Sequence, residues 1–333
     1  MSNTTDLQIS RHPKTLGGDT ARKTRKTAII DLSNRVLNNS DSSQSLIMQR
    51  KPPWIRAEIP SGDGYRAIRE NMDTYGLSTV CQEASCPNIG DCWARGTATI
   101  MILGDICTRS CGFCNVKTGK PKVPDYDEPE RVGKSVALMG LRHIVITCVD
   151  RDDLPDGGAA LWAETIQAVQ SRAPETTIEA LIGDFKGNMA DLAVVIDAKP
   201  DILAHNLETV PRMHGTVRPQ ATYERSMKVL TEIHASGLVS KTGIMVGIGE
   251  TNDEVLTTLS DIQKRANTEI ITIGQYLQPS RNHLPIDRWV HPNQFKIYRE
   301  EGLKMGFRVV ESGPLVRSSY HAEEQVLKLY QKT

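Results

Sequence analysis

The stretch Cys107-Thr108-Arg109-Ser110-Cys111-Gly112-Phe113-Cys114 decides the class of this protein. Its spacing is C-x3-C-x2-C, and it follows a short β-rich run at residues 97–103, so we expect the first strand to end directly in Cys107. A cubane [4Fe–4S] cluster normally takes four thiolates. Three closely spaced thiolates leave one iron without a protein ligand, and an open metal position is typical of a catalytic site. The stretch therefore predicts an iron–sulfur redox enzyme.

A zinc site is the alternative at this stretch. Zinc sites usually have four ligands, with a second Cys or His pair downstream of the first. The sequence places no such pair at the required distance after Cys114, and so iron–sulfur is favoured. The weaker alternative is a zinc-dependent binding module, which would be colourless where an iron–sulfur protein is brown.

A second group of three cysteines precedes the first, at Cys81, Cys86 and Cys92, with the spacing C-x4-C-x5-C. Three cysteines so close together again leave a cluster one ligand short. The alternative is three thiols buried in the core, where free cysteine often lies. Pro87 and Gly90 mark the stretch as loop-rich rather than core-like, so we expect a second cluster here.

The distribution of cysteines also indicates the redox compartment. Six of the seven cysteines fall between Cys81 and Cys114, and the seventh is Cys148, which we expect to be a buried thiol. An odd number in groups of three is a poor disulfide framework and a good metal framework in a reducing compartment.

Charge and hydropathy exclude some classes of partner. The 333 residues carry no formal net charge, which gives no electrostatic sign of nucleic acid or of an anionic membrane. No run approaches the ~18 apolar residues of a spanning helix. Residues 1–48, rich in Ser, Thr, Asn and charge, are predicted to form a disordered leader. The leader contains several aspartates, whereas mitochondrial presequences are poor in acidic residues, so bacterial cytoplasm is favoured over the mitochondrial matrix.

Downstream of the cysteines, short apolar runs alternate with helical segments. The predicted strands are 143–147, 177–182, 201–205, 239–246, 270–275 and, less clearly, 307–310. The predicted helices are 64–75, 128–140, 158–172, 187–197, 219–237, 252–266 and 292–305. This alternation is typical of βαβ units around a parallel sheet. Counting the run before Cys107, six clear strands and one doubtful strand favour a partial barrel over a complete eight-fold one.

The C-x3-C-x2-C motif, with Phe113 just before its last cysteine, resembles the signature of the radical S-adenosylmethionine (SAM) superfamily. In that superfamily the open iron is chelated by the amino and carboxylate groups of SAM. The reduced cluster cleaves SAM to methionine and a 5′-deoxyadenosyl radical, which abstracts hydrogen from unactivated carbon. The resemblance implies an α/β fold, a partial (β/α)6 TIM-like barrel, here with N- and C-terminal extensions.

Further motifs resemble the lipoyl synthase family over about residues 51–325. Besides the two cysteine groups they are KPPWIR at 51–56, VDRDDLPDGG at 149–158, HNLET at 205–209, MVGIGET at 245–251, YLQPS at 276–280 with His283, and RSSYHA at 317–322. The resemblance implies four segments: the leader, an extension with the auxiliary cluster loop at 49–98, the barrel at 99–310, and a C-terminal segment at 311–333 that closes on the auxiliary cluster.

The resemblance also implies the reaction. Two sulfur atoms are inserted at C6 and C8 of an octanoyl chain on a carrier-domain lysine, with two SAM molecules consumed per lipoyl group. The auxiliary [4Fe–4S] cluster donates the sulfurs. The implied partners are octanoylated E2 subunits of 2-oxoacid dehydrogenases, the glycine cleavage H protein, a flavodoxin or ferredoxin reductant, and an iron–sulfur carrier protein. Neither nucleic acid nor a membrane is among them.

Particular residues carry these expectations. By resemblance, Ser319 is the fourth ligand of the auxiliary cluster, with Ser318 as the alternative, and Asp156, Gly157 and Gly158 meet the methionine end of SAM. Four polar residues lie on otherwise apolar predicted strands and need either SAM or a structural partner: Glu179, Asn206, Lys241 and Gln275.

Two rival readings have different chemistry. A radical SAM sulfur-inserting enzyme similar to biotin synthase would lack both the upstream cysteine group and the Arg-Ser-Ser-Tyr tail. A ferredoxin-type electron carrier would need four thiolates for each cluster and no long β/α scaffold.

Overall fold

A computed structural model describes residues 51–56, 62–84, 86–95 and 97–330. The predicted leader lies outside the described residues. From Lys51 onward the chain belongs to one compact unit.

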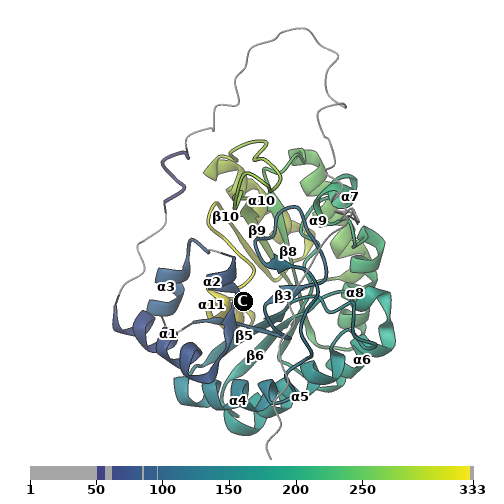
Figure 1. The fold of residues 1–333 in the computed structure, drawn as a ribbon. Helices are drawn as coiled ribbons and strands as arrows, with labels where there is room; N and C mark the ends of the chain where they lie inside the picture. Colours follow the sequence, from purple (N-terminus) through teal and green to yellow (C-terminus); the bar gives the residue numbers. More distant parts are fainter. Residues whose placement is uncertain (1–50, 57–61, 85, 96, 331–333) are drawn as a thin grey trace, which may run out of the picture. The chain divides into compact units, whose positions relative to one another are not determined.

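The core of this unit is an eight-stranded sheet (Figure 1). Its strands, in spatial order, are β1 (Ser78–Thr79), β2 (Thr99–Ile102), β5 (His143–Cys148), β6 (Thr177–Leu181), β7 (Ile202–Ala204), β8 (Val239–Val246), β9 (Ile270–Gln275) and β10 (Val309–Gly313). All neighbouring pairs are parallel except β1 with β2, which is antiparallel. The strand order follows the chain, as it does in a barrel, but β1 and β10 stand at its two ends. The predicted partial barrel is confirmed, and the doubtful last strand is real.

Helices lie on the outer face of the sheet, between successive strands (Figure 1). They are α4 (Glu128–Met139), α5 (Ala159–Arg172), α6 (Met189–Asp197), α8 (Tyr223–Ala235), α9 (Asn252–Ala266) and α10 (Pro292–Met305), with the short α7 (His214–Val217) before α8. Their apolar sides pack on the strands, where Ile146, Leu203 and Ile271 are fully buried. The predicted helices therefore all exist, with small shifts of boundary.

The largest boundary shift is at α8, which was predicted to begin near Pro219. The helix begins at Tyr223 because Thr222, in an extended conformation, accepts a hydrogen bond on its side chain from the backbone N–H of Arg225. That is an N-cap, and a capping side chain fixes a helix start more firmly than a nearby proline. Gly237, the predicted stop, has a left-handed φ of 80° two residues after the helix ends at Ala235.

The expectation that the first strand ends directly in Cys107 is wrong. Strand β2 ends at Ile102, and the chain turns through Leu103 and Gly104, both at positive φ. Cys107 instead ends β3 (Ile106–Cys107), which pairs in parallel with β4 (Lys117–Thr118) in a separate two-stranded sheet. The cysteine loop is thus closed on itself by this small sheet before the chain enters α4.

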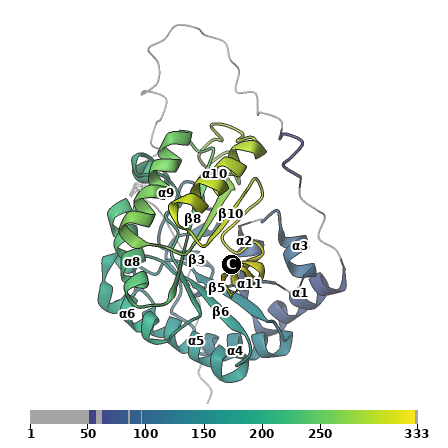
Figure 2. The ribbon, with the colours of Figure 1, turned by 180° about the vertical axis from the view of Figure 1, so that it is seen from behind.

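The prediction that the stretch around the upstream cysteines is loop-rich and unlike the core is only partly right, because Cys86 lies between two short helices whereas Cys81 and Cys92 are buried in the hydrophobic core. Residues before β2 form α1 (Asp63–Tyr75), α2 (Val80–Glu83) and α3 (Ile89–Ala94). Helix α11 (Ala322–Tyr330), which was not predicted, lies beside α2 and α3 in both ribbon views (Figure 2). The contact includes ion pairs of Arg95 with Glu323 and Glu324. The C-terminal helix therefore packs against the helices that carry the upstream cysteines.

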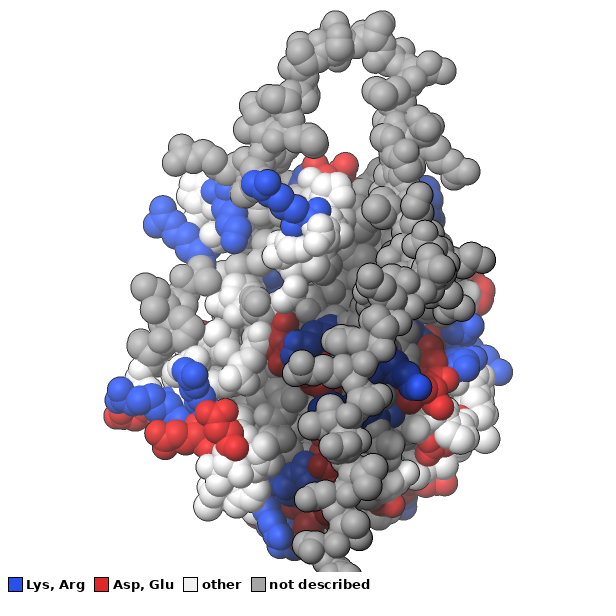
Figure 3. Space-filling model, viewed as in Figure 1, with Lys and Arg blue, Asp and Glu red and all other residues white. Residues whose placement is uncertain are grey.

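On the face shown in Figure 3, basic and acidic side chains are interspersed, in keeping with the zero net charge. In the described part of the chain, no helix combines the length and apolarity needed to cross a bilayer.

Candidate functional site

The 107–114 loop presents three sulfur atoms beyond the carboxyl end of β2. Cys107, Cys111 and Cys114 are each partly buried and none is in a disulfide. Burial raises the pKa of Cys111 to about 12 and that of Cys114 to about 11. The thiolate form therefore needs a counter-charge, which a bound iron cluster supplies.

Backbone donors already point at one of these sulfurs. The N–H groups of Arg109 and Asp150 donate to Cys107 Sγ at 3.4 Å and 3.3 Å. Hydrogen bonds of this kind favour the anionic sulfur and tune the reduction potential of a bound cluster.

Segments distant in sequence hold the other end of the loop. The Gly112 N–H donates to the Val217 carbonyl, and the Gly112 carbonyl accepts from Leu284 N–H. His283 Nε2 lies 2.9 Å from the Cys114 carbonyl, and its Nδ1 lies 2.8 Å from Ser280 Oγ. His283, whose motif gave no role at the sequence level, thus positions the last cysteine of the loop.

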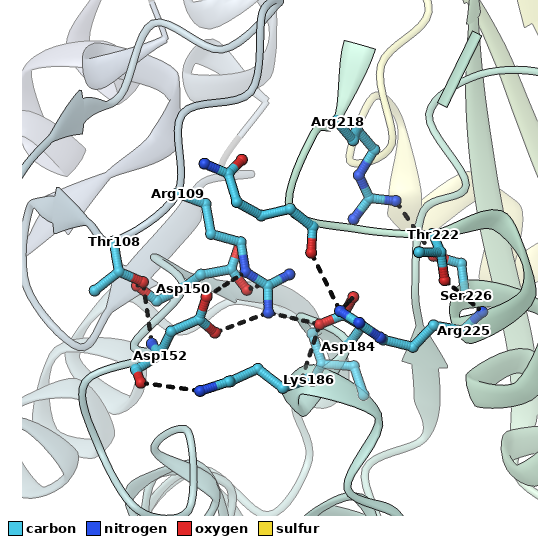
Figure 4. Close-up of polar contacts among 12 residues, drawn as sticks. Thr108, Arg109, Asp150, Asp152, Asp184, Lys186, Arg218, Thr222, Arg225 and Ser226 are labelled. Carbon is cyan, nitrogen blue, oxygen red and sulfur yellow. Dashed lines mark hydrogen bonds and ion pairs between the residues drawn. The ribbon is translucent and has the colours of Figure 1, made fainter. Parts of the chain in front are cut away.

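Arg109, which belongs to the 107–114 loop, is the centre of a buried ion network (Figure 4). It is 3% exposed and pairs with Asp150 at 3.5 Å, Asp152 at 2.8 Å and Asp184 at 2.7 Å. Arg225 adds a second cation to Asp184 at 3.2 Å. Although burial alone would raise it, hydrogen bonding and the charge of Arg109 lower the pKa of Asp184 to about 2. The network joins the cysteine loop to the ends of β5 and β6.

The structure places Asp156, Gly157 and Gly158 at the start of α5. The Asp156 carboxylate accepts from the N–H groups of Gly158 at 2.9 Å and Ala160 at 3.0 Å, which caps the helix. Both glycines have positive φ, and a Cβ on Gly158 would lie 2.5 Å from the Leu103 side chain. Their positive φ, with the packing of Gly158 against Leu103 and of Gly157 against Phe185, explains the glycines without any ligand.

Glu179 and Lys241 form an ion pair inside the barrel. Lys241 Nζ lies 2.7 Å from Glu179 Oε2, and both side chains are essentially unexposed. Although burial alone would raise it, Lys241 and His143 together keep the pKa of Glu179 below its usual range. Glu179 lies in the middle of β6, in register with Ile202 of β7. Lys241 lies nearer the amino end of β8, in register with Ala204 of β7. This arrangement is that of a structural network, the alternative the sequence left open.

Gln275 also has structural partners. Its amide nitrogen donates to the carbonyls of Tyr276 and Arg288, and its amide oxygen accepts from Val290 N–H at 2.8 Å. Asn206 differs, because its amide nitrogen donates to Ser318 Oγ at 2.7 Å and to Glu208 Oε1 at 3.0 Å. Its buried amide oxygen has no hydrogen-bond partner among the described residues. Of these four residues, Glu179 and Asn206 each keep a buried oxygen, Oε1 and Oδ1 respectively, without a hydrogen-bond partner among the described residues.

The upstream cysteines converge on one small cavity. Cys81 on α2, Cys86 after it, and Cys92 on α3 share this cavity with residues of the C-terminal tail. The remaining lining residues are Asn88, Thr97, Thr99, Arg317, Ser319 and Tyr320. The structure thus brings Ser319 to the three cysteines, while Ser318 is hydrogen-bonded to Asn206.

The chemistry of this lining fits an anionic iron–sulfur cluster. Burial and the neighbouring cysteines raise the pKa of Cys81 to about 11 and that of Cys92 to about 12. Arg317 lines the same cavity as the three cysteines and brings a positive charge to it. Soft thiolates with a nearby cation suit a cluster of this type.

Comparison with known proteins fits this geometry. Residues 101–262 match the model of the radical SAM superfamily, and residues 20–86 match the N-terminal domain of lipoyl synthase. A mitochondrial lipoyl synthase of Nematostella vectensis is 52% identical over 277 residues, 83% of this chain and 95% of that protein. A lipoyl synthase of Flavobacterium psychrophilum is 52% identical over 83% of this chain and 96% of its own.

The chain belongs to the lipoyl synthase family. As a member of this radical SAM family it is an enzyme that uses a [4Fe–4S] cluster and SAM. Among solved structures, SuiB of Streptococcus suis bound to S-adenosylmethionine covers 68% of this chain and 55% of its own, with a TM-score of 0.52 and 10% identity. At that identity the likeness shows the fold alone.

The contacts of several residues at the lipoyl synthase site could not be found from the sequence. Arg317 was noted only as part of the RSSYHA motif at 317–322, without a role. Asp150 donates to Cys107 through its backbone N–H, and a backbone contact does not depend on which side chain is present. Arg109 and Asp184 are far apart in the chain and meet only when β2 and β6 are placed in one barrel. Asn206 carried a weak signal, since an amide beside a short apolar strand needs a partner.

Proposed function

We propose that this chain inserts two sulfur atoms, at C6 and C8 of a protein-bound octanoyl-lysine, to give the lipoyl group. The observation that carries the proposal is the pairing of two sites in one chain. One is a three-cysteine loop beyond the carboxyl end of a barrel strand, and the other is a three-cysteine cavity that includes Ser319.

Cys107, Cys111 and Cys114 would hold the SAM-binding cluster, with one iron left to SAM. When bound, the two clusters and SAM supply the electron, the deoxyadenosyl radicals (one from each of two SAM molecules) and the sulfur atoms. The chain itself orients the loop through Arg109 and His283 and stabilises Cys107 through two N–H donors. Among the predicted SAM contacts, Asn206 is best supported, because its unpartnered amide oxygen lies beyond the carboxyl end of β7, whereas Glu179 lies in the middle of β6.

Cys81, Cys86, Cys92 and Ser319 would hold the auxiliary cluster. An alkoxide is a poorer partner for iron in a sulfide cluster than a thiolate is. Ser319 is therefore the ligand best suited to depart when the cluster gives up sulfur. Arg317, beside Cys86, stabilises negative charge at this site. This assignment keeps the segments 49–98 and 311–333 as the two parts that build the auxiliary site around the barrel of 99–310.

The proposed partners follow from the reaction. The substrates are octanoylated carrier domains, namely E2 subunits of 2-oxoacid dehydrogenases and the glycine cleavage H protein. A flavodoxin or ferredoxin supplies electrons, and an iron–sulfur carrier protein restores the consumed cluster. Seven free cysteines favour a reducing compartment, and we place the chain in the cytoplasm.

The test is an anaerobic assay with an octanoylated carrier domain, comparing Cys86→Ala with Cys148→Ala. Cys148 is a matched control because it is half-buried, packs against the hydrophobic core and belongs to neither cysteine group. We expect Cys86→Ala to cleave SAM and to insert no sulfur, and Cys148→Ala to insert both. Sulfur insertion by Cys86→Ala at the wild-type rate would contradict the proposal.

A further inference from the structure

The C-terminal tail crosses the mouth of the barrel before it reaches the upstream cysteines. Strand β10 ends at Gly313, which is in register with Gly274 of β9. A Cβ on Gly274 would lie 2.0 Å from the Val316 carbonyl oxygen and 3.2 Å from Arg317 Nη1. Only a glycine leaves room for this approach, so the tail packs directly on the backbone of β9.

Beyond Arg317 the tail is attached to the chain that follows β7. Asn206 Nδ2 donates to Ser318 Oγ at 2.7 Å, and the sequence separation of these residues is 112. The backbone of Asn206 is itself held in place, because its main-chain carbonyl accepts a hydrogen bond from Arg218 Nη1 at 2.8 Å. A Cβ on Gly243 would lie 2.9 Å from Asn206 Oδ1, so β8 also leaves room for this amide.

The attachment decides which serine faces the cavity. Ser318 and Ser319 are adjacent, and Ser319 lines the cavity of Cys81, Cys86 and Cys92 while Ser318 binds Asn206. We propose that Asn206 is a positioning residue that holds Ser319 toward the auxiliary cluster through its hydrogen bond to Ser318. The inference rests on the proposed role of Ser319.

The hydrogen bond connects the two sites of the enzyme. Glu208 accepts from the same amide nitrogen at 3.0 Å and interacts with Cys111 and Cys114 on one side and with Arg317 on the other. Asn206 and Glu208 therefore connect the chain after β7 to the tail that lines the second cysteine group. Loss of the Asn206 contact frees the one oxygen ligand of the auxiliary cluster and leaves its three thiolates in place.

The experiment uses the full chain carrying Cys107→Ala, Cys111→Ala and Cys114→Ala, so that only the auxiliary cluster is present. Into this parent we introduce Asn206→Ala, Ser318→Ala, both together, Ser318→Thr and Ser319→Ala. Arg95→Ala is the control, since it removes an ion pair between α3 and α11 without touching either serine. The readouts are the rate of iron release to a ferrous chelator and the electron paramagnetic resonance spectrum of the reduced cluster.

We expect Asn206→Ala and Ser318→Ala each to accelerate iron release about two- to tenfold, the size of one hydrogen bond. Their spectra should shift toward that of Ser319→Ala. The double variant should be no faster than either single variant, because both remove the same contact. Ser318→Thr keeps a hydroxyl acceptor and should behave as the parent, as should Arg95→Ala.

Two different results would overturn the inference, and they are distinguishable. If Ser319→Ala accelerates iron release while Asn206→Ala and Ser318→Ala do not, Ser319 is a ligand that needs no positioning by Asn206. If Ser319→Ala itself matches the parent in rate and spectrum, Ser319 is not a ligand, and the proposed auxiliary site fails together with the positioning role.

Discussion

The two cysteine groups are built in different ways. The 107–114 loop is local: its three cysteines stand within eight residues, and buried ion pairs of Arg109 fix the loop on the barrel. The 81–92 group is assembled from two short helices and a tail more than 200 residues later, through contacts such as Asn88 Nδ2 to the Leu315 carbonyl at 2.7 Å. The first site is a single loop held on the barrel by buried ion pairs. The second site is a cavity that is lined in part by the C-terminal tail, which could move away from the cysteines.

This difference predicts that each site can be damaged without the other. The largest effect is expected from Gly274→Ala, because its Cβ would meet the Val316 carbonyl oxygen at 2.0 Å and displace the tail. The auxiliary cluster and sulfur insertion should be lost, whereas the 107–114 site should keep about four irons and cleave SAM. Iron analysis and SAM cleavage after anaerobic reconstitution measure both.

Gly215→Ala is the matched control for that variant, because a Cβ on Gly215, in α7, meets nothing within 4 Å. It should keep both clusters. A Gly274→Ala protein that retained its auxiliary cluster would contradict the view that the tail closes that site.

The next largest effect is expected from Arg109→Leu. The substitution leaves Asp150, Asp152 and Asp184 without their shared cation, and breaking a buried pair costs about 3–5 kcal/mol. Denaturant unfolding measures this loss. Arg172→Ala, which breaks an exposed pair with Glu130, should cost less than about 1 kcal/mol. Equal losses in the two variants would mean that the buried network does not hold the first site.

The smallest effect is expected in the pH dependence of stability, which tests the ion network of the first site. The pKa of Asp184 is lowered to about 2, so its carboxylate contributes stability above its unfolded pKa of about 4 and loses it as pH falls toward 2. Asp184→Asn should therefore be less stable than wild type by about 2 kcal/mol near pH 7, and the gap should narrow between pH 4 and pH 2. Unfolding of the cluster-free protein across this range measures the gap.

Glu130→Gln provides the comparison for that experiment, because Glu130 is exposed and its ion pair is screened by solvent. It should leave the slope of stability against pH nearly unchanged. A gap for Asp184→Asn that stayed constant down to pH 2 would show that the carboxylate does not stabilise the loop as an ion.

The sequence predicted most of what is local. Alternating strands and helices have distinct periodicities, so the elements from β5 to β10 could be assigned, and both cysteine groups were visible as spacings. The start of α8 was misplaced because Thr222 caps the helix, and a single side-chain contact has no periodic signal. The short helices α2 and α3 were missed for a similar reason, since one turn shows no amphipathic pattern.

What the sequence could not give is the pairing of distant residues. Glu179 and Lys241 each needed a partner, and only the barrel shows that they are each other's. The choice between Ser318 and Ser319 was open in sequence, whereas the hydrogen bond from Asn206 to Ser318 and the place of Ser319 beside the cysteines give the two residues different surroundings. Long-range packing carries that information, and it is absent from any window of the chain.

The central claim is that one chain holds two clusters with different tasks. The direct measurement is iron content and SAM cleavage after anaerobic reconstitution, in wild type and in the Cys107→Ala, Cys111→Ala, Cys114→Ala variant. The account predicts about eight irons with SAM cleavage in wild type, and about four irons with no cleavage in the variant. A wild-type protein with about four irons, or with zinc, would contradict the role given to Cys81, Cys86 and Cys92, and sulfur insertion with it.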